Sequence, residues 1–358
     1  MKKKLLLLSL LLLATITSNS QISLDVLNNI IDDVRDEHDI PEITAAVIKT
    51  DDLFYGISGV PRTIKSDTAI LKSKIHLGSI SKTITSLIAM KMVEKNLITL
   101  DTKLTSIVPE LSGIGDANST TLKNLLTNTS GLGEYKKEKD FKKIPSFSGN
   151  RSAKMLEFAK LALDKKSNND NFSNAGYVIA ALMLEKVAKV PYEELVRNVI
   201  EEDLKLSCFT GLPDKGQLQN FWGSWNDSSI QIAHFATNPS LGNEYMMAAE
   251  GISMDIVDYS KILQLNLNGL LGDSNYIDHA SYSTLHFESD EYGYGWRNSN
   301  ADGYKISYHD FQSESYFCHA VIAPRYKVAI IIMAQIKDIS GAYGVYALRD
   351  KLIEKYNK

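Results

Sequence analysis

The sequence contains very little cysteine, and this scarcity excludes one class of fold. Only Cys208 and Cys318 occur among 358 residues, so the chain is not a small domain held together by a disulfide framework. The two thiols could pair in an exported protein, and the sequence leaves that open. No cysteines and histidines stand at the spacing of a metal site, so we expect no metal and no cofactor.

Long apolar runs are also absent beyond the first residues. The leucine-rich run 5–16 is shorter than the ~20 residues that a membrane-spanning helix needs. Lys2–Lys4 precede this run, and the small polar residues Ser18 and Ser20 follow it. This order is typical of a secretory signal peptide rather than a membrane anchor. We therefore expect residues 1–20 to be removed and the mature protein to be secreted or periplasmic, with no membrane span.

Strongly basic stretches are lacking as well. The net charge is −4, which makes nucleic acid a poor candidate partner. The apolar fraction of 44% and the charged fraction of 23% are ordinary for a soluble globular protein. Residues 21–358 are enough for a large core, and we expect one domain built of two lobes.

The order of strand-like and helix-like segments indicates how the lobes are built. Segments with strand-like patterns lie near both chain ends, at 43–48, 53–60, 304–309, 315–323 and 326–334. Helical periodicity marks 24–37 and 342–356, and it dominates the middle of the chain from Ser79 onward. The pattern predicts an α/β (α+β) fold with one antiparallel sheet from both chain ends and an inserted helical lobe. We expect the α/β lobe at about 21–78 and 285–358, and the helical lobe at about 79–284.

The segment Gly78-Ser79-Ile80-Ser81-Lys82 carries the clearest chemical signal. Ser79 and Lys82 are three residues apart at the start of a predicted helix, so they share one face. A helix N-terminus favours developing negative charge on a serine oxygen. A lysine can take the hydroxyl proton if burial lowers its pKa from ~10.4. Alone, Ser-x-x-Lys also fits an ordinary capping serine with a surface lysine.

The surrounding sequence favours the functional interpretation. Over most of its length after residue 20, the chain resembles the class C β-lactamase and D-alanyl-D-alanine carboxypeptidase family, which also includes esterases. The order of the matching segments is more specific than any one of them. They are Gly78–Lys82, Met92–Glu94, Leu100–Asp101, Val108–Leu111, Leu122–Leu132, Ser173–Tyr177, Ala249–Asp255 and Tyr292–Trp296.

The resemblance implies a β-lactamase/transpeptidase-like fold with the active site between the two lobes. It implies that Ser79 is acylated and that Lys82 activates it. Asn174 would hold Lys82 and the substrate amide, and the N–H groups of Ser79 and Gln312 would form the oxyanion hole. The implied activity is that of an exported serine hydrolase. Its substrate would be a small molecule or peptide with an amide or ester bond: a cell-wall peptide, a β-lactam or a small ester.

Two motifs depart from the family pattern. The family's Tyr-x-Asn reads Phe172-Ser173-Asn174, which keeps the ring but loses the hydroxyl that relays the proton. The family's Lys-Thr-Gly or His-x-Gly reads His309-Asp310-Phe311. Residues 309 and 311 of a strand point to the same face. We therefore expect Phe311 to lie beside His309 and to narrow the cleft.

His309 has two interpretations. Its place in the motif favours a positive or hydrogen-bonding group in the cleft, and its free pKa of ~6.5 would even suit a general base. The alternative is a structural histidine of the strand, whose ring nitrogens have ordinary hydrogen-bond partners and no role in the reaction. His319 aligns with no functional position, and we expect it to be structural.

Two hypotheses for the whole protein remain. The first is an active serine hydrolase, which the retained Ser79, Lys82 and Asn174 favour. The second is a catalytically weakened or inactive protein that keeps the fold for binding or sensing. Phe172 and Phe311 favour this second hypothesis.

Overall fold

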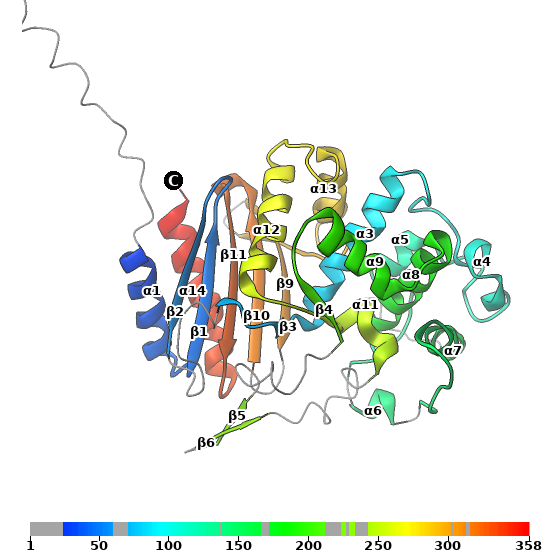
Figure 1. The fold of residues 1–358 in the computed structure, drawn as a ribbon, viewed down its shortest axis with the longest axis horizontal. Coiled ribbons are helices and arrows are strands. Elements are labelled where there is room, and N and C mark those ends of the chain that lie inside the picture. The colour runs from blue at the N-terminus through cyan, green and yellow to red at the C-terminus, as the bar shows by residue number, and fades with distance from the viewer. Residues whose placement is uncertain are drawn as a thin grey trace, which may run out of the picture.

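We describe a computed structural model of the chain (Figure 1). The predicted signal peptide, residues 1–20, lies outside the described residues. These are 24–59, 71–136, 138–142, 144–165, 172–211, 223–226, 229–232, 243–301, 304–312 and 316–357.

One six-stranded sheet forms the centre of the α/β lobe. Its strands lie in the order β2-β1-β11-β10-β9-β8, and neighbouring strands are antiparallel. Because β1 pairs with β11, a strand from the start of the chain lies beside its last strand. This confirms the predicted sheet from both chain ends. The strands are β1 Glu42–Ile48, β2 Leu53–Ser58, β8 Arg297–Ala301, β9 Tyr304–Gln312, β10 Tyr316–Ala323 and β11 Val328–Gln335.

Helices cover both faces of this sheet. The terminal helices α1 (Leu24–Glu37) and α14 (Ile339–Tyr356) pack on one face, and α12 (Ile256–Leu270) packs on the other (Figure 1). Alternate residues of β1 therefore enter two different cores: Ala45 and Val47 face α1 and α14, whereas Ala46 and Ile48 face α12. This explains why every position of β1 is buried. α12 lies in the range predicted as helical lobe, yet it belongs to the layer on the sheet.

Most of the remaining helices form the second lobe (right in Figure 1), whereas α13 (His279–Phe287) lies beside α12. The centre of this lobe is α8, whose apolar residues on all sides make it a buried helix. The helices of the lobe are η1 Gly78–Ile80, α3 Ser81–Glu94, α4 Leu104–Ile107, η2 Pro109–Leu111, α5 Leu122–Leu126, α6 Glu138–Phe141, α7 Arg151–Asp164, α8 Asn174–Ala188, α9 Tyr192–Arg197, η3 Asn198–Asp203, η5 Glu244–Met246 and α11 Met247–Glu250.

Small strands and a turn complete the described elements. β3 and β4 flank β7 in a three-stranded sheet, and β5 pairs with β6. They span β3 Ile75–His76, β4 Cys208–Thr210, β5 Gly223–Asn226, β6 Ser229–Ile232 and β7 Ile252–Met254, with the turn η6 at Pro324–Tyr326.

The two cysteines do not pair. Cys208 lies on β4 and Cys318 lies buried on β10, and both thiols are free. The possibility of a disulfide is therefore wrong. Within the described ranges, no helix is both long enough and apolar enough to span a bilayer.

Candidate active site

The segment that carries Ser79 is a tight turn placed between the sheet and the helical lobe. Ser79 lies in η1, and α3 begins only at Ser81, so the serine precedes the helix by one turn of 3₁₀ structure. η1 packs against β9. Gly78 has a φ of +50°, and a Cβ there would lie 2.0 Å from the ring of Phe311. Glycine at this position therefore allows both the turn and the close approach of β9.

Ser79 and Lys82 are in contact, as the sequence predicted. Lys82 Nζ donates a hydrogen bond to Ser79 Oγ at 3.2 Å and another to the carbonyl oxygen of Ala249 at 3.0 Å. The lysine side chain is fully buried. Burial lowers its pKa to about 7, with Lys136 and Arg297 acting in the same direction, and the neighbouring Glu250 opposes them. Lys82 therefore changes charge close to neutral pH.

Glu250 is a site residue that the sequence analysis did not identify. It ends α11 and is only 3% exposed. Its Oε1 accepts a hydrogen bond from Ser79 Oγ at 3.1 Å and a second from Asn174 Nδ2 at 2.9 Å. The only signal in the sequence was a carboxylate inside the matching segment Ala249–Asp255. The structure thus places a carboxylate directly against the proposed nucleophile.

Asn174 lies at the site but does not hold Lys82. It begins α8, after Ser173 caps the helix. Its Nδ2 donates to Glu250 and to the carbonyl oxygen of Tyr135 at 3.1 Å. Both partners only accept, which fixes the orientation of the amide. Asn174 Oδ1 is buried and has no partner among the described residues, so the expected hydrogen bond to Lys82 is absent and an acceptor remains available.

Phe172 lies over the buried lysine. Its ring centroid is 4.6 Å from Lys82 Nζ, 5.7 Å from Lys136 Nζ and 5.8 Å from Arg297 Cζ. The face of an aromatic ring attracts cations, so Phe172 gathers three positive groups at the site. The ring carries no hydroxyl and cannot relay a proton.

His309 is buried on β9 and is neutral. Its Nδ1 donates to the carbonyl oxygen of Gly295 at 2.7 Å, because a carbonyl can only accept. Burial, together with the charges of Lys82 and Arg297, lowers the pKa of His309 to about 3. Of the two roles expected for His309 in the cleft, its contacts therefore favour the hydrogen-bonding one, and the imidazole is a weak base. Gly295 has a φ of +78°, and a Cβ there would lie 2.6 Å from the backbone oxygen of Lys82.

Phe311 and Gln312 take different positions at the end of β9. Phe311 packs on Gly78 and makes an edge contact with His76 at 5.5 Å between ring centroids. It is not among the described residues that line the cavity at Ser79. Phe311 therefore packs against η1, and the narrowing of the cleft stays a prediction. Gln312, the last residue of β9, does line the cavity.

The cavity at Ser79 is small, with a volume of about 220 Å³. Two cations belong to its lining, Lys136 from the loop before α6 and Arg297 from β8. Among the described residues, no group of three His, Cys, Asp or Glu side chains is placed to hold a metal ion. The lining consists of Ser79, Lys136, Phe172, Arg297, Tyr308, His309, Asp310, Gln312, Phe317 and Tyr346.

His319 orients one wall of this cavity. Its fully buried ring contacts Asp310 through Nδ1, and Tyr346 donates to the same carboxylate at 3.0 Å. These contacts lower the pKa of Asp310, although its burial acts in the opposite direction. Asp310 is thus held as an anion by two neighbours, and His319 supports the wall without reaching Ser79 by any described contact.

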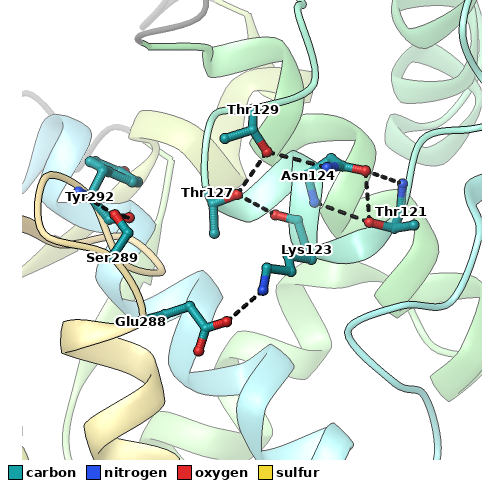
Figure 2. Close-up of polar contacts among 8 residues, drawn as sticks. All are labelled: Thr121, Lys123, Asn124, Thr127, Thr129, Glu288, Ser289 and Tyr292. Atoms are coloured by element: carbon teal, nitrogen blue, oxygen red, sulfur yellow. Dashed lines mark hydrogen bonds and ion pairs between the residues drawn. The ribbon is translucent and has the colours of Figure 1, made fainter.

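A second cavity of about 470 Å³ shares Arg297 with the first. Figure 2 shows the polar contacts along its wall, where Lys123 Nζ meets Glu288 Oε1 at 2.5 Å and Thr127 contacts Thr129 at 3.0 Å. The ion pair joins α5 to the end of α13. Tyr292 also lines the cavity, and its hydroxyl oxygen lies 3.3 Å from that of the buried Tyr177. The cavity therefore extends the site along the junction of these elements.

Comparisons with known proteins agree with this architecture. The fold is similar to a beta-lactamase from Sulfitobacter sp. EE-36, with a TM-score of 0.73, 14% identity, and coverage of 94% of this chain and 100% of that chain. An octameric penicillin-binding protein homologue from Pyrococcus abyssi gives a TM-score of 0.69 at 20% identity, covering 94% of this chain and 79% of that one. A D-stereospecific amidohydrolase from Streptomyces sp. gives 0.65 at 17%, covering 87% and 94%.

A match to a family sequence model assigns the chain to a family. A search of curated proteins finds no significant relative. The sequence model of the Beta-lactamase family, however, matches residues 27–350, which is most of the chain. The structural neighbours share only the fold at these identities, whereas the family match covers both lobes and every segment of the site. The chain therefore belongs to the beta-lactamase family.

Proposed function

We propose that the protein is an exported serine hydrolase that forms an acyl-enzyme on Ser79 and cleaves an amide or ester bond. The single observation that carries this proposal is the contact of Ser79 Oγ with Lys82 Nζ at 3.2 Å, inside a cavity that Ser79 lines. A buried lysine whose pKa is lowered to about 7 is unusual outside functional sites. Export rests on the signal-like residues 1–20.

The chemistry begins with attack of Ser79 Oγ on a carbonyl carbon. The carbonyl oxygen gains negative charge, which the N–H groups of Ser79 and Gln312 are expected to bind. Expulsion of the amine or alcohol leaves an ester on Ser79, and water then releases the acid. The position of Ser79 at the start of η1 and α3 favours this developing charge.

The lining of the cavity favours a substrate with a free carboxylate. Lys136 and Arg297 bring two positive charges to the cavity at Ser79, against the single negative charge of Asp310. Asn174 does not line this cavity, but its Oδ1 is a buried acceptor without a partner among the described residues. We propose that a substrate N–H pairs with it, because leaving such an acceptor unpaired costs roughly 1–3 kcal/mol. A peptide with an amide N–H and a terminal carboxylate satisfies both features, as would a β-lactam. The structural neighbours include a beta-lactamase and a D-stereospecific amidohydrolase, in agreement with an amide substrate.

Phe172 supports a second candidate function, a binding or sensing protein with little turnover. The hydroxyl that relays the proton in the family is missing at this position, while the ring still covers Lys82. Such a protein would bind the same carboxylate-bearing molecules and release them unchanged.

Turnover of three substrate types separates the two functions. Purified protein, with Ser79→Ala as the blank, is assayed with p-nitrophenyl acetate, a peptide ending in D-alanyl-D-alanine, and nitrocefin. We expect hydrolysis of the ester or the peptide that depends on Ser79, with slow or no turnover of nitrocefin. Binding of the peptide without hydrolysis of any of the three would favour the binding protein.

A further inference from the structure

The reaction outlined above leaves one buried group at the nucleophile without a role. Glu250 is 3% exposed and contacts Ser79 Oγ at 3.1 Å. Burying a carboxylate is costly unless charges and hydrogen bonds compensate it. Here Asn174 Nδ2 donates to the same oxygen at 2.9 Å, and the charge of Glu250 acts on Lys82. Glu250 is therefore a buried hydrogen-bond acceptor at the Ser79 oxygen, and Asn174 and Lys82 compensate its burial.

The directions of the hydrogen bonds decide where the serine proton points. A lysine ammonium group can only donate, and a carboxylate can only accept. Lys82 Nζ already donates to Ser79 Oγ and to the carbonyl oxygen of Ala249. The single hydroxyl proton of Ser79 is then directed at Glu250 Oε1. With Lys82 charged, the carboxylate is the group in contact that can receive this proton.

From this geometry we infer that Glu250 is the catalytic base that takes the proton of Ser79, in place of the tyrosine hydroxyl that Phe172 lacks. The inference rests on the proposed function. Lys82 then acts as a hydrogen-bond donor that stabilises the oxygen as it loses its proton. Asn174 positions the carboxylate through its amide nitrogen.

The proton and electron pairs balance through both halves of the reaction. The Ser79 O–H bond breaks, its proton moves to Glu250, and the oxygen lone pair bonds to the carbonyl carbon. The C–N or C–O bond then breaks, and the leaving group takes the proton from Glu250. In the second half, Glu250 takes a proton from water as the water oxygen attacks the acyl carbon. The serine oxygen leaves with its electron pair and regains the proton.

The two histidines near the site are poorer bases, and the hydrogen-bond geometry disfavours Lys82 as the base for Ser79. His309 has no described contact with Ser79, and burial lowers its pKa to about 3. His76 on β3 lies near Glu250, and burial lowers its pKa to about 4. To act as the base, Lys82 would have to lose a proton, and the Ser79 hydroxyl would have to turn away from Glu250.

Glu250→Gln tests the inference, because the amide retains an oxygen acceptor for Asn174 and Ser79 but is not basic. The readout is the rate of acylation in the first turnover of p-nitrophenyl acetate, corrected with Ser79→Ala. We expect a fall of roughly 10²–10⁴-fold, the usual contribution of a placed proton acceptor, at an unchanged melting temperature. Glu244→Gln, which removes a more exposed carboxylate on η5, is the matched control and should leave the rate unchanged.

A second variant distinguishes a base from a group that only shapes the site. Adding Phe172→Tyr to Glu250→Gln places a phenol beside Lys82. The double variant should react at least about tenfold faster than Glu250→Gln alone. Sodium formate should likewise raise the rate of Glu250→Ala and leave the wild type unchanged, a readout that remains if the glutamine variant folds poorly. A folded Glu250→Gln within about threefold of the wild-type rate overturns the inference. Absence of any Ser79-dependent acylation in the wild type instead overturns the proposed function.

Discussion

Lys82 is the residue whose surroundings differ most from those of a free amino acid. It is fully buried, with Glu250, Lys136, Arg297 and His309 as the charged or titratable groups around it. Burial is the largest cause of its lowered pKa, and the carboxylate only partly offsets it. The proton state of Lys82 therefore changes within the pH range in which the protein can be assayed.

The pH dependence of the rate should report the role of Lys82. If Glu250 accepts the proton and charged Lys82 stabilises the serine oxygen, the rate falls as pH rises through about 7, where Lys82 loses its proton. If neutral Lys82 is the base, the rate rises through the same range. We expect the fall, measured as kcat/KM for p-nitrophenyl acetate with a Ser79→Ala blank at each pH. A rise with a midpoint near 7 would contradict this assignment.

At the scale of residues, the sequence predicted the site contact that depends on local spacing along the chain. Ser79 and Lys82 lie three residues apart, and helical geometry alone brings them together. Glu250 is 171 residues away from Ser79, so its contact depends on how α11 packs against η1 and α3. Similarly, the pKa of His309 depends on burial and on Lys82 and Arg297, which the motif does not encode.

At the scale of elements, the contact between η1 and β9 sets the position of the nucleophile. The ring of Phe311 occupies the space where any Cβ on residue 78 would lie, at 2.0 Å. The family's glycine on β9 has become phenylalanine, and Gly78 accommodates it. The two residues therefore act as a pair that holds the turn against the strand.

Gly78→Ala should destabilise the protein by two separable effects. A positive φ costs about 1 kcal/mol for a non-glycine residue, and the clash with Phe311 adds roughly 1–3 kcal/mol. Gly113→Ala is the matched control, since Gly113 has a φ of +80° with open space around its Cβ position. Urea unfolding should give a larger loss at Gly78 than at Gly113.

The double variant tests whether the clash is with Phe311. Phe311→Ala alone should cost stability through the cavity it leaves, but it also relieves the clash in Gly78→Ala. The combined loss should be smaller than the two separate losses added together. Additive losses would show that Phe311 is not the obstacle.

Elements with a clear periodic pattern were the ones that the sequence predicted. The helix Leu24–Glu37 has the predicted bounds, and β1 and β2 lie within the strand-like segments predicted near the start of the chain, apart from Glu42 at the first end of β1. β8 was missed, because Arg297–Ala301 is polar without alternation and becomes a strand only by pairing with β9. The short helix α6 was also missed, because Glu138–Phe141 is too short for a helical periodicity, although Phe141 is buried.

At the scale of the whole molecule, buried histidines couple stability to pH. Burial lowers the pKa of His76 to about 4 and those of His286 and His309 to about 3. Below pH ~6.5 the unfolded chain binds protons at these residues while the folded chain does not, so stability is lost as pH falls. Glu42 acts in the opposite direction, because burial raises its pKa to about 8 and only the folded chain binds that proton.

The three histidines outnumber Glu42, so the free energy of unfolding should decrease from about pH 6.5 to about pH 5. Each proton that the unfolded chain binds in excess of the folded chain changes the free energy of unfolding by ~1.4 kcal/mol per pH unit. His286 contacts Ser307 and Asn266 through its two ring nitrogens, and its complete burial disfavours the charged form. His286→Gln should reduce the slope by about one proton in urea unfolding at several pH values. An unchanged slope would show that His286 does not titrate on unfolding.

Both lobes contribute to the site, and this is the central feature of the account. Ser79 and Lys82 come from the start of the helical lobe, Glu250 from α11, and His309 and Gln312 from the sheet. The segments from which the sequence predicted a site do lie together in the folded chain. The claim that follows is that Ser79 is a nucleophile activated by its surroundings rather than an ordinary buried serine.

Intact mass after incubation with a fluorophosphonate tests this claim most directly. We predict one covalent adduct per chain, located on Ser79 by peptide mapping, and lost in Ser79→Ala while the melting temperature stays close to that of the wild type. Absence of an adduct on the folded wild type, or an adduct that persists in Ser79→Ala, would contradict it.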